Sequence, residues 1–274
     1  MRASSRAAAT AKSAASVSLA SMVATHYRVP SHVCFSTDQD GTAILNIERG
    51  KFHSLLGAGS IAWQQIAAHS NGATLDTIVN KLLTEETEFA SEPREKVRQS
   101  VSRLLDTLME NGLVETSEHP SVRVFGGVRK FTCTATAGAV RRLTSLLIKW
   151  QLPRAAALLE FAMFQVIRWV GRFPARYYTV KRWPIESQQV VEQADIAQLC
   201  AAVDEAATWY PKESLCLQKA SVTACLLRQY GIPAELKIGI HKLPFSGHAW
   251  VEVAGKVIND HRGVQKYFKV IDVW

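Results

Sequence analysis

The stretch Ser214–Pro233, SLCLQKASVTACLLRQYGIP, decides how the C-terminal half of this chain is interpreted. Ser214 is a good helix N-cap and the Gly-Ile-Pro at the far end stops a helix, so the segment predicts one helix. Cys216 would then lie in the first turn, where unpaired backbone N–H groups and the helix dipole favour a thiolate. Cys225, farther along the same helix, has no such stabilisation and is predicted to pack in the core.

The residues after this helix predict antiparallel strands that bring a histidine and an aspartate together. Residues 234–240 and 249–253 alternate between apolar and polar, and residues 257–260 follow a turn. His248 would begin the second strand and Asp260 would end the third, side by side. A thiol at a helix start with a neighbouring imidazole and carboxylate is the arrangement of a nucleophile, its base and an orienting group, in which the carboxylate would hold Nδ1–H. Taken singly, each residue keeps a structural alternative: a buried thiol, a structural histidine and a turn aspartate.

Other kinds of site fit the sequence poorly. Cys216 and Cys225 are nine residues apart on one predicted helix and would face different directions, which argues against a zinc site with His248 and His261. The glycine-rich Gly57–Ser60 lacks the lysine of a phosphate-binding loop. The sequence therefore predicts neither a metal nor a cofactor.

Composition indicates a two-module chain in a reducing compartment. The 274 residues include five cysteines, an odd number without CxxC pairing, which favours a cytoplasmic protein over a secreted disulfide framework. Residues 31–118 carry seven basic and thirteen acidic residues, whereas residues 119–274 carry twenty-one basic and eleven acidic ones. A change of charge sign along the chain favours two modules. The basic residues are dispersed rather than striped, so a nucleic-acid partner is not expected.

The first half of the chain predicts a small α+β module. Three short antiparallel strands are separated by the turn signals Asp40-Gly41 and Arg49-Gly50. Three helices follow, with start signals at Ser60, Thr74 and Pro93. Three strands followed by three helices are typical of a winged-helix-like module.

The sequence divides into four segments. We expect a disordered tail over residues 1–30, the α+β module over 31–118, a linker over 119–139 and a second domain over 140–274. The second domain opens on an apolar stretch that charged residues interrupt, which predicts two helices broken near Pro153 and no transmembrane span. Peripheral membrane contact through a basic amphipathic face remains an alternative for this stretch.

Two parts of the sequence resemble known families. Residues 205–265 resemble the transglutaminase-like cysteine peptidase of lasso-peptide biosynthesis, the maturation B protein. The resemblance rests on the Cys-Leu that opens the helix, the GIPAE turn, the HAW…D pair and separations of 32 and 12 residues between the cysteine, histidine and aspartate. Residues 33–116 resemble the PqqD-like precursor-recognition domain. In this family that domain is either a separate protein or fused to the peptidase, as in this chain.

The resemblance implies an α+β chain in which a winged-helix-like PqqD-type domain precedes a transglutaminase/papain-like domain of helices and antiparallel sheet. It implies a cysteine endopeptidase that binds the leader of a ribosomally synthesised precursor and cleaves it from the core peptide. An ATP-dependent, asparagine-synthetase-like cyclase would then close the macrolactam. The implied catalytic residues are Cys216, His248 and Asp260.

The resemblance also implies how the leader is bound. The leader would add as an extra strand to residues 51–56, against the third helix of the module. The residues expected to line this groove are Lys51, Phe52, Leu55, Val101 and Leu105. Two alternatives remain: a transglutaminase-like acyltransferase that resolves the same thioester with an amine, and a precursor-binding adaptor without catalysis.

Overall fold

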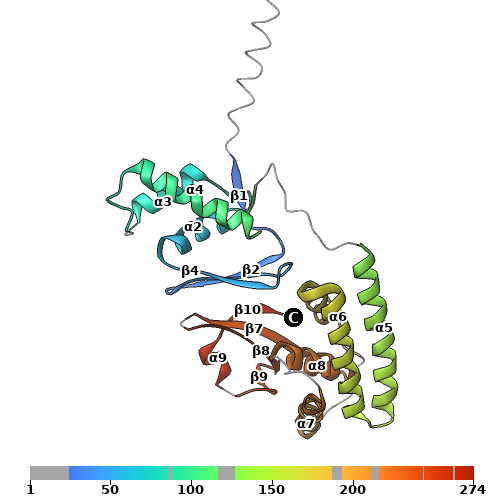
Figure 1. The fold of residues 1–274 in the computed structure, drawn as a ribbon. Coiled ribbons are helices and arrows are strands. Elements are labelled where there is room, and N and C mark those ends of the chain that lie inside the picture. Colours follow the sequence, from blue (N-terminus) through green and yellow to red (C-terminus); the bar gives the residue numbers. More distant parts are fainter. Residues whose placement is uncertain are drawn as a thin grey trace, which may run out of the picture. The chain divides into compact units, whose positions relative to one another are not determined.

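The computed structural model describes residues 25–85, 88–116, 127–186, 193–210, 216–242, 244–261 and 263–274 (Figure 1). The chain folds as two compact units. The first unit is Met1–Pro30 with Ile61–Ser121, and the second is Ser31–Ser60 with Val122–Trp274. The residues of the module predicted over 31–118 are therefore divided between the two units, and its boundaries stay a prediction.

The first unit combines short strands with two complete helices and with residues 61–67 of α2 (Gly57–Ala67). β1 (His26–Arg28) pairs antiparallel with both β5 (Ala73–Thr74) and β6 (Glu115–Thr116). α3 (Leu75–Thr84) and α4 (Arg94–Glu110) pack against each other. β1 lies inside the segment for which the sequence predicts a disordered tail, and its backbone is ordered by pairing on both edges.

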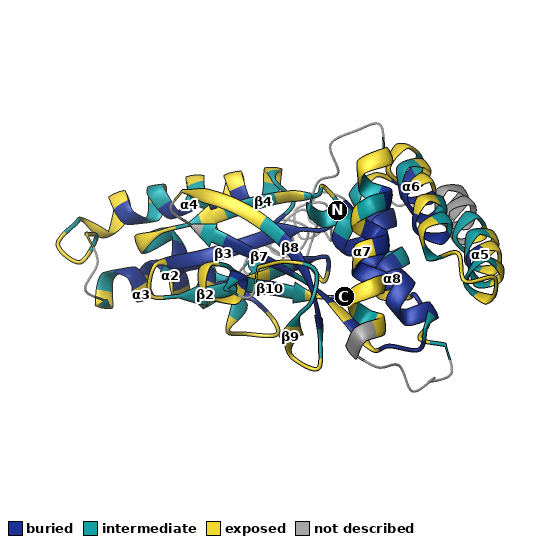
Figure 2. Cartoon of the chain, turned by 90° about the horizontal axis from the view of Figure 1, so that it is seen from below, coloured by how far each residue is buried: buried dark blue, intermediate teal, exposed yellow. Residues whose placement is uncertain are grey.

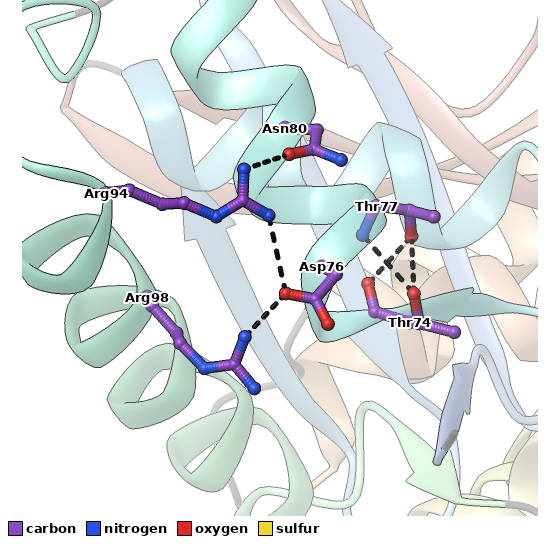
Figure 3. A network of polar contacts seen from close by, with 6 residues as sticks. All are labelled: Thr74, Asp76, Thr77, Asn80, Arg94 and Arg98. Atoms are coloured by element: carbon purple, nitrogen blue, oxygen red, sulfur yellow. Dashed lines mark hydrogen bonds and ion pairs between the residues drawn. The ribbon is translucent and has the colours of Figure 1, made fainter. Parts of the chain in front are cut away.

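Polar side chains join α3 to α4 in the first unit (Figure 3). Thr74 caps α3 as predicted, because its hydroxyl accepts the backbone N–H of Thr77 at 3.3 Å. Asp76 in the first turn of α3 binds two arginines of α4, Arg98 at 2.5 Å and Arg94 at 3.6 Å. These exposed ion pairs link the two helices at the start of α3.

The second unit begins with a three-stranded antiparallel sheet, as the turn signals predict. Its strands are β2 (Val33–Asp38), β3 (Gly41–Asn46) and β4 (Lys51–Leu55), in that order. Gly41 and Gly50 hold the two turns with φ of 126° and 61°, which other residues adopt only with strain. β3 is buried along its whole length.

One helix, α2, begins in the second unit directly after the sheet and continues into the first unit from residue 61, and four long helices of the second unit come later in the chain. α2 (Gly57–Ala67) begins three residues before the predicted cap, at a glycine with φ of 49°. α5 (Gly127–Lys149) starts inside the predicted linker, and α6 (Pro153–Lys181) follows the predicted break. α7 (Gln193–Trp209) and α8 (Cys216–Gln229) complete the set. Among the described residues, no helix combines the length and apolarity needed to cross a membrane.

A second antiparallel sheet ends the chain. Its order is β10-β7-β8-β9, with β7 (Ala234–Lys242) and β8 (Phe245–Val253) at the centre. β9 (Lys256–Val257) is a two-residue edge strand, and α9 (Val264–Tyr267) leads into the opposite edge, β10 (Lys269–Val273). The mixture of helices and antiparallel sheets confirms the predicted α+β class; α9 and β10 are not predicted from the sequence.

The core of the second unit surrounds α8, which is dark blue along most of its length in Figure 2. α8 packs on β7 and β8, and also on α6 and α7. Arg228 near its end donates to the backbone oxygens of Ala234, Val180 and Trp274 at 2.8, 2.6 and 2.6 Å. A single buried guanidinium thus holds three other segments to the end of the helix that begins with Cys216.

Candidate active site

The two cysteines of α8 occupy different environments. Cys216 is the first residue of the helix and is half-buried, whereas Cys225 is fully buried in the core, as predicted. The sequence places a cap at Ser214, which lies outside the described residues. The sulfur of Cys216 accepts the backbone N–H of Leu217 in the first turn and that of Ala249 in β8. The helix start therefore supplies an N–H group to the sulfur.

His248 and Asp260 lie close together as the sequence predicts, but each has a different position relative to its strand from the one predicted. His248 is the fourth residue of β8 and not its first, and it lies opposite Gly239 of β7. Asp260 follows β9 and is not part of the strand. Asp260 Oδ2 lies 2.5 Å from Nε2 of His248. The expected bond to Nδ1 is therefore wrong: the carboxylate holds Nε2, which leaves Nδ1 for the Cys216 thiol that the imidazole contacts.

A side chain replaces backbone pairing just before Asp260. The Asn259 Oδ1 accepts the backbone N–H of Val251 at 2.7 Å, and Ile258 N–H donates to the Val251 oxygen at 3.1 Å. Because the asparagine amide has taken the place of a strand partner, the third strand ends early and the chain turns. Asp260 Oδ1 then accepts the N–H of His261 at 2.6 Å, which orients the other oxygen toward His248.

Aromatic rings fix the imidazole in place. The ring of Phe268 lies 5.0 Å from that of His248, and the ring of Trp250 lies 6.4 Å away in a stacked orientation. Trp250 itself is fully buried and occupies the space over Gly239, where a Cβ would come within 2.8 Å of the indole. Gly239 is thus required by close packing beneath the histidine.

The contacts of Cys216 and His248 shift the pKa values of both side chains. The hydrogen bond to Cys216 raises the pKa of His248 to about 9 against the opposing effect of burial, and Asp260 adds to the rise. Burial alone would raise the pKa of the Cys216 thiol, but the hydrogen bonds from His248 and the two backbone N–H groups bring it below its ordinary value. Both shifts favour the charged forms, a thiolate beside an imidazolium, which is the reactive form of a nucleophilic cysteine.

A polar network around Glu252, next to Trp250, was not predicted from the sequence. Glu252, two residues beyond Trp250 on β8, is 2% exposed and accepts the Trp250 indole N–H at 2.7 Å. Gln265 donates to the same carboxylate at 2.6 Å, and Lys237 pairs with it at 2.7 Å. The network anchors the indole that stacks on His248. The signal in the sequence is a glutamate inside the apolar strand AWVEV.

The residues expected to bind a leader fall into two groups. Lys51, Phe52 and Leu55 lie on β4, which pairs with β3 on one edge and has no second strand among the described residues. Side chains alternate along a strand, so Phe52 and Leu55 point to opposite faces of the sheet. Val101 and Leu105 lie on α4 in the other unit and are 2% and 1% exposed, so both pack in a core. The leader groove itself stays a prediction.

The described residues hold no cluster of three or more His, Cys, Asp or Glu side chains placed to bind a metal ion. The chemistry that this arrangement can perform is attack of the Cys216 sulfur on an electrophilic carbon, with His248 as the proton carrier. Acyl transfer through a thioester is the reaction that a thiolate–imidazolium pair of this kind supports.

Comparison with known proteins identifies two domains. Residues 157–273 match the model of the transglutaminase-like superfamily, and residues 41–114 match that of coenzyme PQQ synthesis protein D (PqqD). The microcin J25-processing protein McjB of Escherichia coli is 39% identical over 59 residues, which are 22% of this chain and 28% of that protein. No solved structure matches the chain. A PqqD domain and a transglutaminase-like domain are thus joined in one chain, as the sequence resemblance implies.

Proposed function

We propose that this chain is the leader peptidase of a lasso-peptide pathway, a cysteine endopeptidase that binds a precursor peptide through its PqqD domain and cleaves it with its transglutaminase-like domain. The observation that carries the proposal is the contact chain from Cys216 through His248 to Asp260, with an imidazole pKa raised to about 9. The similarity to McjB, a protein described as processing microcin J25, supports the choice of substrate class.

Cleavage would proceed in two balanced steps. The Cys216 sulfur adds to the carbonyl carbon at the leader–core junction, and the imidazolium of His248 gives its proton to the leaving amine as the C–N bond breaks. A thioester of the leader remains on the enzyme. Neutral His248 then takes a proton from water, whose oxygen attacks the thioester, and the leader leaves with a carboxylate while the thiol is restored. The backbone N–H of Cys216 is the proposed oxyanion donor.

The free edge of β4 is the proposed leader-binding element. An extended peptide added there would bond to backbone groups that no described strand uses. Lys51 and Leu55 would then face one side of the added strand and Phe52 the other. Binding at the PqqD domain would raise the local concentration of the scissile bond near Cys216, because both domains belong to one chain.

The partner proposed for the released core peptide is a separate ATP-dependent, asparagine-synthetase-like cyclase. A reducing cytoplasm is the proposed compartment, since it would keep the Cys216 thiol free. A short reading frame beside this gene should encode the precursor, with glycine or a similar residue at the start of its core and an aspartate or glutamate several residues on.

The rival acyltransferase would form the same thioester and resolve it with an amine. Incubation of the precursor in heavy-oxygen water separates the two reactions. Hydrolysis releases a free leader whose new carboxylate carries one heavy oxygen, and mass spectrometry detects it. A new amide on the leader, without a labelled carboxylate, would contradict the peptidase assignment. Leader binding without any product would favour the adaptor alternative.

A further inference from the structure

An exposed apolar line runs along the end of α5. Leu143, Leu146 and Trp150 are spaced by three and four residues, so they share one face of the helix. Their exposed fractions are 51%, 48% and 71%, and Leu152 in the turn that follows is 47% exposed. We call these four residues the α5 stripe. In Figure 2 the part of this helix whose burial is described shows yellow, exposed segments.

The rotation of α5 is fixed by contacts on its other side. The Thr144 hydroxyl donates to Oε1 of buried Gln229 at 2.6 Å, and Arg141 pairs with Glu186 at 2.6 Å. Leu147 and Ile148 pack against the core of the second unit. Because these contacts hold the inward side of α5 against the second unit, the α5 stripe lies on the outward, solvent-exposed side of the helix.

A basic line lies beside the α5 stripe. Arg142 and Lys149 are exposed, and their spacing of seven residues puts them two turns apart on one side of the helix. Neither has an ion-pair partner among the described residues, whereas the neighbouring Arg154 pairs with Glu205 at 2.7 Å. Residues 119–185 contain one acidic residue, Glu160, and it is fully buried. The exposed carboxylates next to α5, Glu186 and Glu205, are paired with Arg141 and Arg154, so the charges left without an ion-pair partner beside the α5 stripe, among the described residues, are the positive ones of Arg142 and Lys149.

We propose that the α5 stripe docks onto the surface of an anionic phospholipid bilayer. Tryptophan and leucine side chains partition into the boundary between headgroups and acyl chains, while lysine and arginine beside them attract anionic headgroups. Charge favours this occupant over a second copy of the chain, since a symmetric contact would oppose Arg142 and Lys149 to the same residues. Membrane docking would hold the peptidase at the bilayer without a spanning helix.

Flotation with extruded vesicles tests the proposal on the full-length protein. The wild-type chain should float with vesicles of equimolar phosphatidylglycerol and phosphatidylcholine, and not with pure phosphatidylcholine. The double variant Arg142→Glu/Lys149→Glu should bind at least about 30-fold more weakly, at about fivefold for each basic residue. Trp150→Ser should weaken binding by about tenfold or more.

Matched controls separate the α5 stripe from overall charge and exposure. Lys256→Glu/Lys266→Glu changes the net charge equally at exposed positions elsewhere, and Trp209→Ser removes a tryptophan that is 78% exposed at the end of α7. Both controls should float like the wild type. Circular dichroism and thermal unfolding check that each variant is folded.

Three outcomes would overturn the proposal. The first is that folded wild-type protein fails to float, or floats equally when the α5 stripe is altered. The second is a wild-type dimer in light scattering that Trp150→Ser converts to a monomer, which would assign the surface to self-association. The third is an association with the cyclase that Trp150→Ser abolishes in the absence of vesicle binding, which would assign it to a protein partner.

Discussion

The thiol of Cys216 makes the largest contribution to the raised pKa of His248, so its removal should make the imidazole less basic. With the pKa at about 9, about 99% of the imidazole is protonated at pH 7. At the ordinary value of about 6.5 the protonated fraction would be about 24%. In Cys216→Ala, Asp260 still favours the imidazolium and burial still opposes it. We therefore expect the His248 pKa to fall by at least about one unit.

The assay is a pH titration of the His248 ring resonances by nuclear magnetic resonance, in the wild type and in two cysteine variants. Cys225→Ala is the matched control, because that thiol is buried in the core and does not touch the imidazole. Cys225→Ala should leave the pKa of His248 unchanged. An unchanged pKa in Cys216→Ala, or a wild-type pKa at the ordinary value, would refute the ion-pair argument.

Two further variants test the surroundings of the site, and a third tests the buried carboxylate of Glu160 on α6, which accepts a hydrogen bond from Gln229 at the far end of α8. Asp260→Asn should lower kcat by about ten- to a hundredfold. It should also move the alkaline limb of the pH–rate profile to lower pH, because His248 loses a group that raises its pKa. An alkaline limb at the wild-type pH would count against this role of Asp260. Asn259→Ala removes the acceptor of the Val251 N–H, so kcat should fall while leader affinity, measured by calorimetry, is kept. Glu160 has a pKa raised well above its ordinary value, mainly by burial, so the folded state holds a proton that the unfolded chain releases. Stability should therefore fall as pH rises above about 4.5, and Glu160→Gln should flatten this slope in urea titrations at several pH values; a steeper slope would reverse the assignment.

The sequence predicts the elements that carry strong local signals. Glycine at positions of positive φ marks the β2–β3 and β3–β4 turns, and Thr74 supplies a side-chain cap to α3. The cysteine at the start of α8, and a histidine and an aspartate that lie close together after it, are predicted from residue type and spacing. These features are local, or depend on neighbouring hairpins, and so they can be inferred without tertiary contacts.

Features that depend on tertiary contact could not be predicted. β1, β5 and β6 have two or three residues each, too few for a period-two pattern, and they exist because they pair with one another. The use of Nε2 by Asp260 depends on Asn259, which ends the third strand early by binding Val251. Burial of Glu252 beneath Trp250 likewise follows from packing that no single strand encodes.

The central claim is that Cys216 is the nucleophile that releases a leader peptide. The most direct measurement is mass spectrometry of the neighbouring precursor after incubation with wild-type, Cys216→Ala and Cys225→Ala protein, together with leader affinity for each. The account predicts free leader with the wild type and with Cys225→Ala, and none with Cys216→Ala although its leader affinity is unchanged. Leader release by folded Cys216→Ala at the wild-type rate would contradict it.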